Sequence, residues 1–346
     1  LFTLRGKEHD TLSEVPAGDI AAVAKLAHTT TGDTFSTKDD PVTLPAVEMP
    51  EPLLAFAITP KTKGDEDKLS IALSRLKEED PTLRVDRSDE THETVMYGMG
   101  EAHLDVQIER MKRKFGVEVT TAPAKIAYRE TIRGPGKGVG RHVKQTGGHG
   151  QYAVCTIEVE PLPRGEGFEY VDKIFGGAIP HQFIGSVEKG IVKTMQQGVI
   201  SGNPMVDIRC TLVDGKFHSV DSSDMAFQLA GSLALKEAAT AAGVVLLEPI
   251  VEVDVVVPES HTGDIMGDLN AKRAKIQGVE SAGAGKQRVK ALVPQAEVAR
   301  YSIDLRSMTG GRAAFTMHFS HYEEVPSHLA DKIIAATQQA KEEARK

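Results

Sequence analysis

The sequence predicts an α+β protein of several domains, and three observations support this. The chain has 346 residues, whereas a single hydrophobic core stops growing at about 250–300 residues. Hydrophobic residues make up 40% and charged residues 26% of the chain, a balance typical of folded proteins rather than disordered or fibrous ones. Stretches with the two-residue period of strands alternate with stretches of helical period, and prolines separate the groups.

The first segment, residues 1–47, is predicted to be part of a β-barrel. Turn signals at Ala17-Gly18-Asp19 and Thr31-Gly32-Asp33 separate short apolar runs, which is the pattern of short strands joined by tight turns. Prolines at the end of this segment and just beyond it indicate a linker, because proline cannot continue a helix and restricts the residue before it.

Residues 52–124 show the order of a ferredoxin-like βαββαβ domain. An apolar run precedes a helix that begins near Asp65, two strand-like stretches follow, and a second helix from Glu101 leads to a last strand near Val117. The apolar residues at helical spacing are Leu69, Ala72, Leu73 and Leu76 in the first helix and Leu104, Ile108, Met111 and Phe115 in the second.

Residues 248–346 repeat that order and add a helix after Pro326. Valines alternate with acids at 251–257, as in a half-buried strand. A helix from about Gly263 places Ile265, Leu269 and Ile276 on one stripe, two strands flank the turn Gly283-Ala284-Gly285, and a short helix near Glu297 precedes the strand at 315–319. We therefore predict a second ferredoxin-like domain.

The intervening residues, 125–247, predict a mixed α/β domain with long strands at 152–159 and 206–213. A first helix carries Ile184, Val187, Ile191 and Met195 on one side. A second helix starts after Asp221-Ser222-Ser223, whose side-chain oxygens can accept hydrogen bonds from the open amides of its first turn.

No motif predicts a catalytic residue, a metal ligand or a cofactor site in this chain. The stretch Gly283 to Lys286 is the nearest approach to a phosphate-binding loop, but Gln287 follows where Ser or Thr is needed, and the stretch joins two strands. The histidines are dispersed, and His318 and His321 lie three apart on a strand, which puts them on opposite faces. Ser222 and Ser223 are better explained as a helix cap than as nucleophiles.

Three further features bear on location and on the extent of the chain. Cys155 and Cys210 cannot form a disulfide framework, so we expect them to be ordinary strand residues in a reducing cytoplasm. No apolar run approaches the roughly 18 residues that a membrane-spanning helix needs. The start, Leu1 to Lys7, is too polar for a signal peptide and lacks an initiator Met, and it suggests a piece of a longer chain.

A glycine-rich basic segment, Gly134 to Gly150, is exceptional in a chain of net charge −8. It holds Lys137, Arg141 and Lys144, two histidines and no acid. Glycines allow close approach to a partner, and the cations can contact RNA phosphates; a long solvated hairpin is the alternative. Three phosphate contacts, at ~0.7 each, give a slope of about −2 for log affinity against log salt concentration. Such a segment would therefore bind RNA weakly and would not anchor the chain.

Several ordered motifs resemble elongation factor G. They are Ile58-Thr59-Pro60-Lys61-Thr62-Lys63, Glu78-Glu79-Asp80-Pro81-Thr82, Gly98-Met99-Gly100-Glu101-Ala102-His103-Leu104, Gln145-Thr146-Gly147-Gly148-His149-Gly150-Gln151-Tyr152, Val159-Glu160-Pro161-Leu162-Pro163, Phe217-His218-Ser219-Val220-Asp221-Ser222-Ser223-Asp224-Met225-Ala226-Phe227, Gly267-Asp268-Leu269-Asn270, Asp304-Leu305-Arg306-Ser307-Met308-Thr309 and Phe319-Ser320-His321-Tyr322-Glu323-Glu324-Val325-Pro326. Long motifs in the right order are far more specific than any single glycine motif.

The resemblance implies a domain plan. Residues 1–47 would be the latter part of the family's second domain, and 52–124, 125–247 and 248–346 its third, fourth and fifth, the fourth with a ribosomal protein S5 domain 2-like fold. GTP and Mg²⁺ belong to the family's GTPase domain, which is not in this sequence, so this chain by itself is expected to bind no GTP and to be no enzyme. The implied partner is the ribosome, with its rRNA and with tRNA and mRNA at the decoding site; no membrane is implied, and the chain is expected to be a cytoplasmic monomer.

The resemblance also implies where the contact lies. In the family two loops form the tip of the fourth domain, and here they map onto Gly147 to Gln151 and Lys216 to Ser219. The implied tip residues are Gly147, Gly148, His149, Gly150, Gln151 and His218, with Lys137, Arg141 and Lys144 as basic support. His149 stands where the family usually has Arg, whereas His218 matches the family's tip histidine.

The implied function is promotion of tRNA–mRNA translocation. An elongation-factor-G-like factor for ribosome recycling or ribosome protection is the alternative, which the substitution of His149 for Arg favours. From another class, ferredoxin-like folds also host small acylphosphatases, and fold alone does not fix function.

Overall fold

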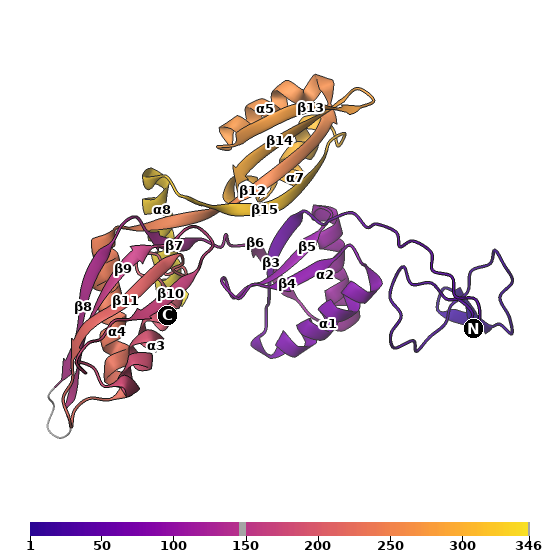
Figure 1. Ribbon diagram of the computed structural model, residues 1–346. Helices are drawn as coiled ribbons and strands as arrows, with labels where there is room; N and C mark the ends of the chain where they lie inside the picture. The colour runs from indigo at the N-terminus through magenta and orange to yellow at the C-terminus, as the bar shows by residue number, and fades with distance from the viewer. Residues whose placement is uncertain (145–149, 345–346) are drawn as a thin grey trace.

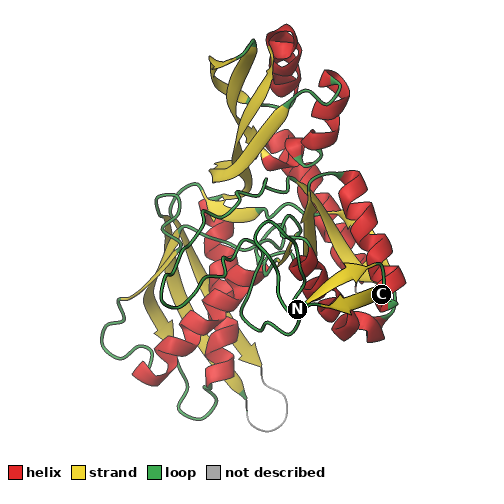
Figure 2. Cartoon of the chain, turned by 90° about the vertical axis from the view of Figure 1, so that its right-hand side faces the viewer, coloured by secondary structure: helices red, strands yellow, loops and turns green. Residues whose placement is uncertain are grey.

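The computed structural model describes residues 1–144 and 150–344, with side chains up to residue 339. Its larger sheets each lie against one hydrophobic core. Figure 1 shows these units as separate lobes that follow an N-terminal segment, and Figure 2 shows helices packed against the strands of each lobe. The protein is therefore a mixed α/β chain of several domains, as predicted.

The N-terminal segment corrects the prediction of a partial β-barrel over 1–47. It contains the strands β1 (Phe2–Arg5) and β2 (Glu8–Thr11), an isolated bridge from Phe2 to Ala22, and no further strand or helix before residue 54. Apolar side chains such as Ile20 (88% exposed) and Phe35 (69%) remain in solvent. Two short strands cannot bury a hydrophobic face, so the sheet does not close into a barrel.

The second unit has the predicted βαββαβ order. Its elements are β3 (Leu54–Pro60), η1 (Lys63–Asp65), α1 (Glu66–Glu79), β4 (Arg84–Arg87), β5 (Thr94–Gly98), α2 (Glu101–Phe115) and β6 (Val119–Pro123), and the antiparallel sheet has the order β4-β5-β3-β6. The predicted apolar faces of both helices supply the core, with Ile108 and Phe115 at its margin.

The last unit has the same strand order, which confirms the structural repeat. Its elements are β12 (Val244–Pro258), η2 (Glu259–His261), α5 (Thr262–Ala271), β13 (Lys275–Gly283), β14 (Lys286–Pro294), α6 (Gln295–Val298), α7 (Tyr301–Thr309), β15 (Ala314–Glu324) and α8 (Ser327–Ala344), with the sheet order β13-β14-β12-β15. Ile265 and Leu269 are buried on α5 as predicted. Ile276 is instead a strand residue, because the helix ends at Ala271 and the chain turns at Arg273, where φ is 60°.

The middle unit has a four-stranded sheet with two helices on one face. Its elements are β7 (Arg129–Ile132), β8 (Gly136–Lys144), β9 (Gln151–Pro161), β10 (Phe168–Asp172), α3 (His181–Gln197), β11 (Ile208–Lys216) and α4 (Asp224–Ala242), and the sheet order is β10-β11-β9-β8. As predicted, Ser223 caps α4, accepting a hydrogen bond from the amide of Ala226 at 3.3 Å.

One long strand joins the middle and last units. The first residues of β12 pair with β7, and from Ile250 onward β12 pairs with β14. The two pairings therefore belong to one continuous strand of 15 residues. Figure 1 shows this strand passing from one lobe to the other. A hydrogen-bonded strand is a stiffer connection than a loop, so β12 fixes the direction in which the middle unit extends.

The glycines of β8 serve close packing inside the chain. A Cβ at Gly136, Gly138 or Gly140 would lie 2.2, 2.3 or 1.7 Å from a carbonyl oxygen of α4. These oxygens belong to Ala238, Ala234 and Ala230. Alternate glycines on one strand thus face alanines spaced by four on a helix, so the partner that these glycines approach is α4 of the same chain.

A buried carboxylate organises the base of the middle unit. Glu130 on β7 is 0% exposed and accepts hydrogen bonds from the amides of Val199 at 2.6 Å and Ser201 at 2.7 Å and from the Ser201 hydroxyl at 2.6 Å. The turn after α3 is thereby held against the sheet, because a buried carboxylate needs several donors to offset its lost hydration.

We predict that Gly140→Ala lowers the free energy of unfolding by about 3 kcal/mol or more, because overpacking costs 1–3 kcal/mol even where side chains can yield and here the methyl group meets the backbone of Ala230. Gly134→Ala is the control, since a Cβ there has nothing within 4 Å. Urea denaturation followed by circular dichroism measures both, and equal midpoints would contradict the packing argument.

Glu130→Gln should lower the free energy of unfolding by about 1.5–3 kcal/mol, the range for hydrogen bonds to charged groups. The amide keeps the shape of the carboxylate but directs an NH₂ group at amide donors. Glu158→Gln, at an exposed position of β9, is the matched control. Indistinguishable thermal unfolding of the two variants would count against this role of Glu130.

Candidate nucleic-acid interface

Two sequence-distant loops meet at the end of the middle unit. One follows β8 and enters β9; the other runs from β11 to α4. Asp221 of the second loop accepts a hydrogen bond from the Gly150 amide at 3.1 Å through its carboxylate, and from the Tyr152 amide at 2.9 Å through its carbonyl. The Ser222 hydroxyl donates to the Tyr152 carbonyl at 2.7 Å. Three hydrogen bonds thus fasten the two loops to one another.

His218 lies on the outside of this junction, with its side chain 54% exposed. Its amide donates to the Ser222 hydroxyl at 2.9 Å, and its Nδ1 lies 3.3 Å from the amides of Val220 and Asp221 and 3.3 Å from the Asp221 carboxylate. Its ring centroid is 6.2 Å from that of Tyr152. The ring contacts to Val220 and Asp221 are thus made by Nδ1.

The other predicted tip residues divide into two groups. Gly150 and Gln151 are in the junction, and the Gln151 side-chain oxygen lies 2.8 Å from Nε2 of the buried His142. Gly147, Gly148 and His149 lie outside the described residues. That any of these residues contacts RNA stays a prediction.

The three cations predicted as basic support do not share one environment. Lys137 forms an ion pair with Glu158 at 3.0 Å. Arg141 and Lys144 are exposed nearer the tip, and neither has an ion-pair partner in the part of the chain that the structure describes. Lys137 is therefore already neutralised at the base of the sheet.

Sequence reasoning missed the residues that hold the loops together. The sequence places Asp221 and Ser222 before the second helix as capping residues and Tyr152 at the start of the strand at 152–159, and it does not pair them. Lys216, at the end of β11, is exposed near Arg141 but lies far from the basic segment in sequence. A local pattern cannot show these pairings, because about 70 residues separate the two loops.

Away from the tip, the described residues include two buried cysteines and no cluster of metal-ligating side chains. Cys155 and Cys210 are buried on β9 and β11, and burial raises the pKa of each thiol to about 12. Within the described ranges no three His, Cys, Asp or Glu side chains are grouped as a metal site, and no helix there is long and apolar enough to cross a bilayer.

A His–Asp pair in the second unit is structural. His103 Nε2 lies 2.8 Å from Asp80 Oδ2, and Gln107 donates to the same oxygen at 2.9 Å. Burial raises the pKa of Asp80, but hydrogen bonds from Thr82 and His103 outweigh it and keep the pKa below its ordinary value. Hydrogen bonds among Asp80, His103 and Gln107 thus tie the end of α1 to α2.

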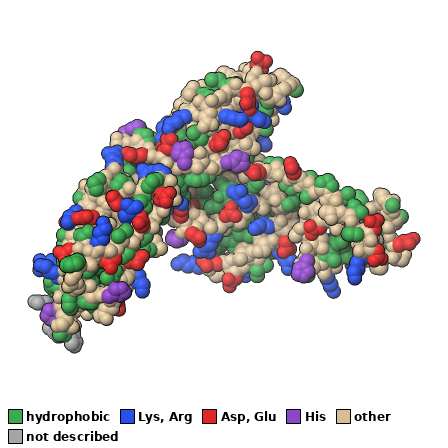
Figure 3. All heavy atoms as spheres, viewed as in Figure 1, with side chains coloured by type: hydrophobic (Ala, Val, Ile, Leu, Met, Phe, Trp, Pro, Cys, Tyr) green, Lys and Arg blue, Asp and Glu red, His purple; other side chains and the backbone are tan. Residues whose placement is uncertain are grey.

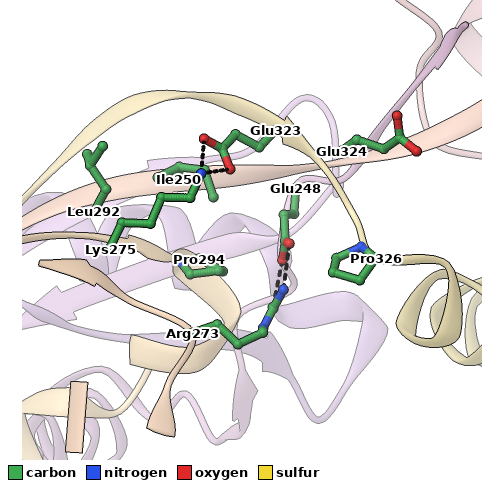
Figure 4. A pocket seen from close by; sticks show the side chains of 9 residues that line it. All are labelled: Glu248, Ile250, Arg273, Lys275, Leu292, Pro294, Glu323, Glu324 and Pro326. Atoms are coloured by element: carbon green, nitrogen blue, oxygen red, sulfur yellow. Dashed lines mark hydrogen bonds and ion pairs between the residues drawn. The ribbon is translucent and has the colours of Figure 1, made fainter. Parts of the chain in front are cut away.

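A cavity of about 170 Å³ in the last unit is lined in part by paired charges. Figure 4 shows Arg273 directed at Glu248 and Lys275 directed at Glu323. The two Arg273–Glu248 contacts are both 2.8 Å, and the shorter Lys275–Glu323 contact is 2.7 Å. Since the charges of these four side chains are already compensated, the cavity is a poor candidate for a ligand site.

One arginine links all three large units. Arg129 of β7 forms an ion pair with Glu90 of the second unit and lies 4.4 Å over the Tyr322 ring of the last unit. The Tyr322 hydroxyl donates to the Ala127 carbonyl at 3.0 Å. This joint holds the base of the middle unit, opposite the loops that carry His218.

Three family models match consecutive parts of the chain. They are "Elongation Factor G, domain III" over residues 49–123, "Elongation factor G, domain IV" over 124–243 and "Elongation factor G C-terminus" over 245–333. The chain belongs to the elongation factor G family. The fastened loops lie at the end of its domain IV, and Arg129 joins domains III, IV and the C-terminal domain.

Relatives agree with this assignment to the elongation factor G family. An elongation factor G-like protein of Mycobacterium tuberculosis (strain CDC 1551 / Oshkosh) is 53% identical over 330 residues, covering 95% of this chain and 46% of the relative. Elongation factor G of Aquifex pyrophilus is 50% identical over 336 residues, covering 96% and 48%. The chain thus spans about half the length of these curated relatives.

A solved structure also resembles this chain. A crystal structure of a Thermus thermophilus protein matches it with a TM-score of 0.81 at 38% identity, covering 98% of this chain and 51% of the other. The arrangement of domains therefore recurs at moderate sequence identity.

Asp221→Ala should loosen the junction of the two tip loops at Gly150, because it removes the carboxylate that accepts the Gly150 amide. We expect the Gly150 amide to exchange with solvent about tenfold faster, because losing one hydrogen bond of about 1–1.5 kcal/mol permits that much more opening. Hydrogen exchange measures this, and Asp221→Asn, which keeps an acceptor oxygen, should stay near wild type. Unchanged exchange in the Ala variant would contradict the fastening.

Proposed function

We propose that this chain is the part of a translation factor that reaches into the ribosome, where its domain IV promotes the movement of tRNA and mRNA. The observation that carries the proposal is the pair of loops fastened at the end of an extended domain, with His218 exposed on them. The family models and the 50% identity to an elongation factor G support it.

The geometry suits a mechanical role. An arm that occupies a site and so disfavours the return of tRNA needs a stiff support and a specific tip, and it needs no nucleophile. Stiffness comes from the continuous strand β12 and from the close contact of β8 with α4. Specificity would come from His218 and its neighbours, which present hydrogen-bonding groups to bases or phosphates of RNA.

Hydrolysis of GTP is proposed to lie in another part of the parent protein. The matched models are those of domains III, IV and the C-terminus. In this view GTP and Mg²⁺ would act elsewhere in the parent, and this chain would contribute the ribosome contact.

A second candidate is a specialised factor for ribosome recycling or protection. It is favoured by the name of the Mycobacterium tuberculosis relative, an elongation factor G-like protein, and by His149 in place of the usual Arg. The parent protein discriminates the two: splitting of post-termination ribosomes without advance of mRNA supports the second candidate, and advance of mRNA supports the first.

We predict that His218→Ala in the parent slows translocation about tenfold with little change in GTP hydrolysis, because one lost contact of about 1.4 kcal/mol changes a rate by a factor of ten. Stopped-flow detection of mRNA movement measures the rate. His328→Ala, exposed at the start of α8, is the control. Equal rates for His218→Ala and wild type would refute the tip assignment.

A further inference from the structure

The sheet of the middle unit has an open face. Helices α3 and α4 cover the other face, where Cys155, Ile157 and Leu212 enter the core. Because successive side chains of a strand point to opposite faces, every second residue of β8 and β9 lies on the open face, and so do alternate residues of β11 on either side of the bulge between Leu212 and Asp214. The strand register groups these residues into rows that run across the sheet.

At the base of this face the cations are paired. In one row Arg209 lies between Glu160 and Glu169, at 2.8 and 2.6 Å. In the next row toward the tip Lys137 is opposite Glu158, at 3.0 Å. Positive charge is therefore locally cancelled here.

Near the tip the cations described on this face are not paired with acids across the strands. Arg141 and Lys216 both lie opposite Val154, one on each side, so two cations flank one apolar residue. Both are exposed, and within the described residues neither forms an ion pair. Asp214, an acid in the adjacent row of the face, accepts the amide of Gly215 at 2.8 Å.

Aromatic groups continue this surface toward the loops. Tyr152, half-buried, lies in the following row opposite Val143, and its ring approaches that of His218. Lys144 ends β8 at the same margin. Figure 3 shows Lys and Arg atoms on the outline of this lobe near its lower left end.

We propose that the tip half of this open face, centred on the row Arg141–Val154–Lys216, binds the phosphate backbone of an RNA strand. The inference rests on the proposed function and deepens it, since it names the side of the arm that meets RNA. The row Arg141–Val154–Lys216 holds two cations and no acid, which favours an anion, and the guanidinium fork of Arg141 matches a phosphate. Tyr152 and His218 beside them offer rings on which bases can stack, which favours RNA over an acidic protein segment.

The expected strength is modest. Strands are about 4.8 Å apart, so the Cα atoms of Arg141 and Lys216 are about 10 Å apart and their side chains can reach two separate phosphates. Two contacts give a salt slope of about −1.4 from ~0.7 each, and a fourfold rise in salt then weakens binding roughly sevenfold. The face would orient the arm beside RNA, while other surfaces supply most of the affinity.

The first test measures the affinity of the 346-residue chain for ribosomes over a series of salt concentrations. The double variant Arg141→Ala/Lys216→Ala should flatten the slope of log affinity against log salt by about 1.4. The control Lys137→Ala/Arg209→Ala removes the same charge from the base of the same face, where the cations are paired, and should keep the wild-type slope.

The outcomes distinguish failure of the RNA-binding face from failure of the proposed function. A wild-type slope in the tip variant, or equal flattening in both variants, overturns the inference and leaves the proposed function standing. A wild-type chain that does not bind ribosomes overturns both.

The second test identifies the partner by crosslinking. Lys216→Cys introduces an exposed thiol, while Cys155 and Cys210 are buried with raised pKa values, so a photoreactive maleimide labels the new site. We expect ribosomal RNA to be crosslinked from Lys216→Cys and not from the control Lys137→Cys. Crosslinks from Lys216→Cys to ribosomal protein alone would overturn the assignment to RNA.

Discussion

The closeness of α4 to its neighbours is the constraint on which the structure of domain IV depends. On one side the glycines of β8 let the strand lie against helix carbonyls, and on the other a Cβ at Gly190 of α3 would lie 2.0 Å from the Gln228 carbonyl. Interiors packed this tightly transmit displacement instead of absorbing it. A force applied at the tip is therefore carried to the base of the domain.

The base and the tip of domain IV use polar groups in different ways. At the base, Glu130 is buried among donors and Arg129 joins three domains, so charges serve to hold parts of the chain together. At the tip, Asp221 and Ser222 fasten the loops while His218, Arg141 and Lys216 stay exposed. An acidic chain thus keeps exposed cations at the end of the domain that lies opposite the joint.

Periodicity predicted most of the fold, because burial of one helical face leaves a local signature. A few residues of sequence are enough to recognise the apolar faces of α1 and α2, the alternation in β12 and the Ser223 cap. Where local signals were weak the prediction was wrong: Ile276 was assigned to a helix that ends earlier, and residues 1–47 have strand-like runs without a partner sheet to bury them.

Thus the sequence alone determined the order of elements and the two βαββαβ units, because both depend on local patterns of apolar residues. It also determined the resemblance to elongation factor G, because long motifs carry that resemblance. Only the tertiary structure decided how the basic segment is arranged. Gly136, Gly138 and Gly140 pack on α4, Lys137 is paired with Glu158, and Arg141 acquires Lys216 as a neighbour across β9. The physical reason is that pairing across a sheet depends on register between distant strands, which no single stretch of sequence contains.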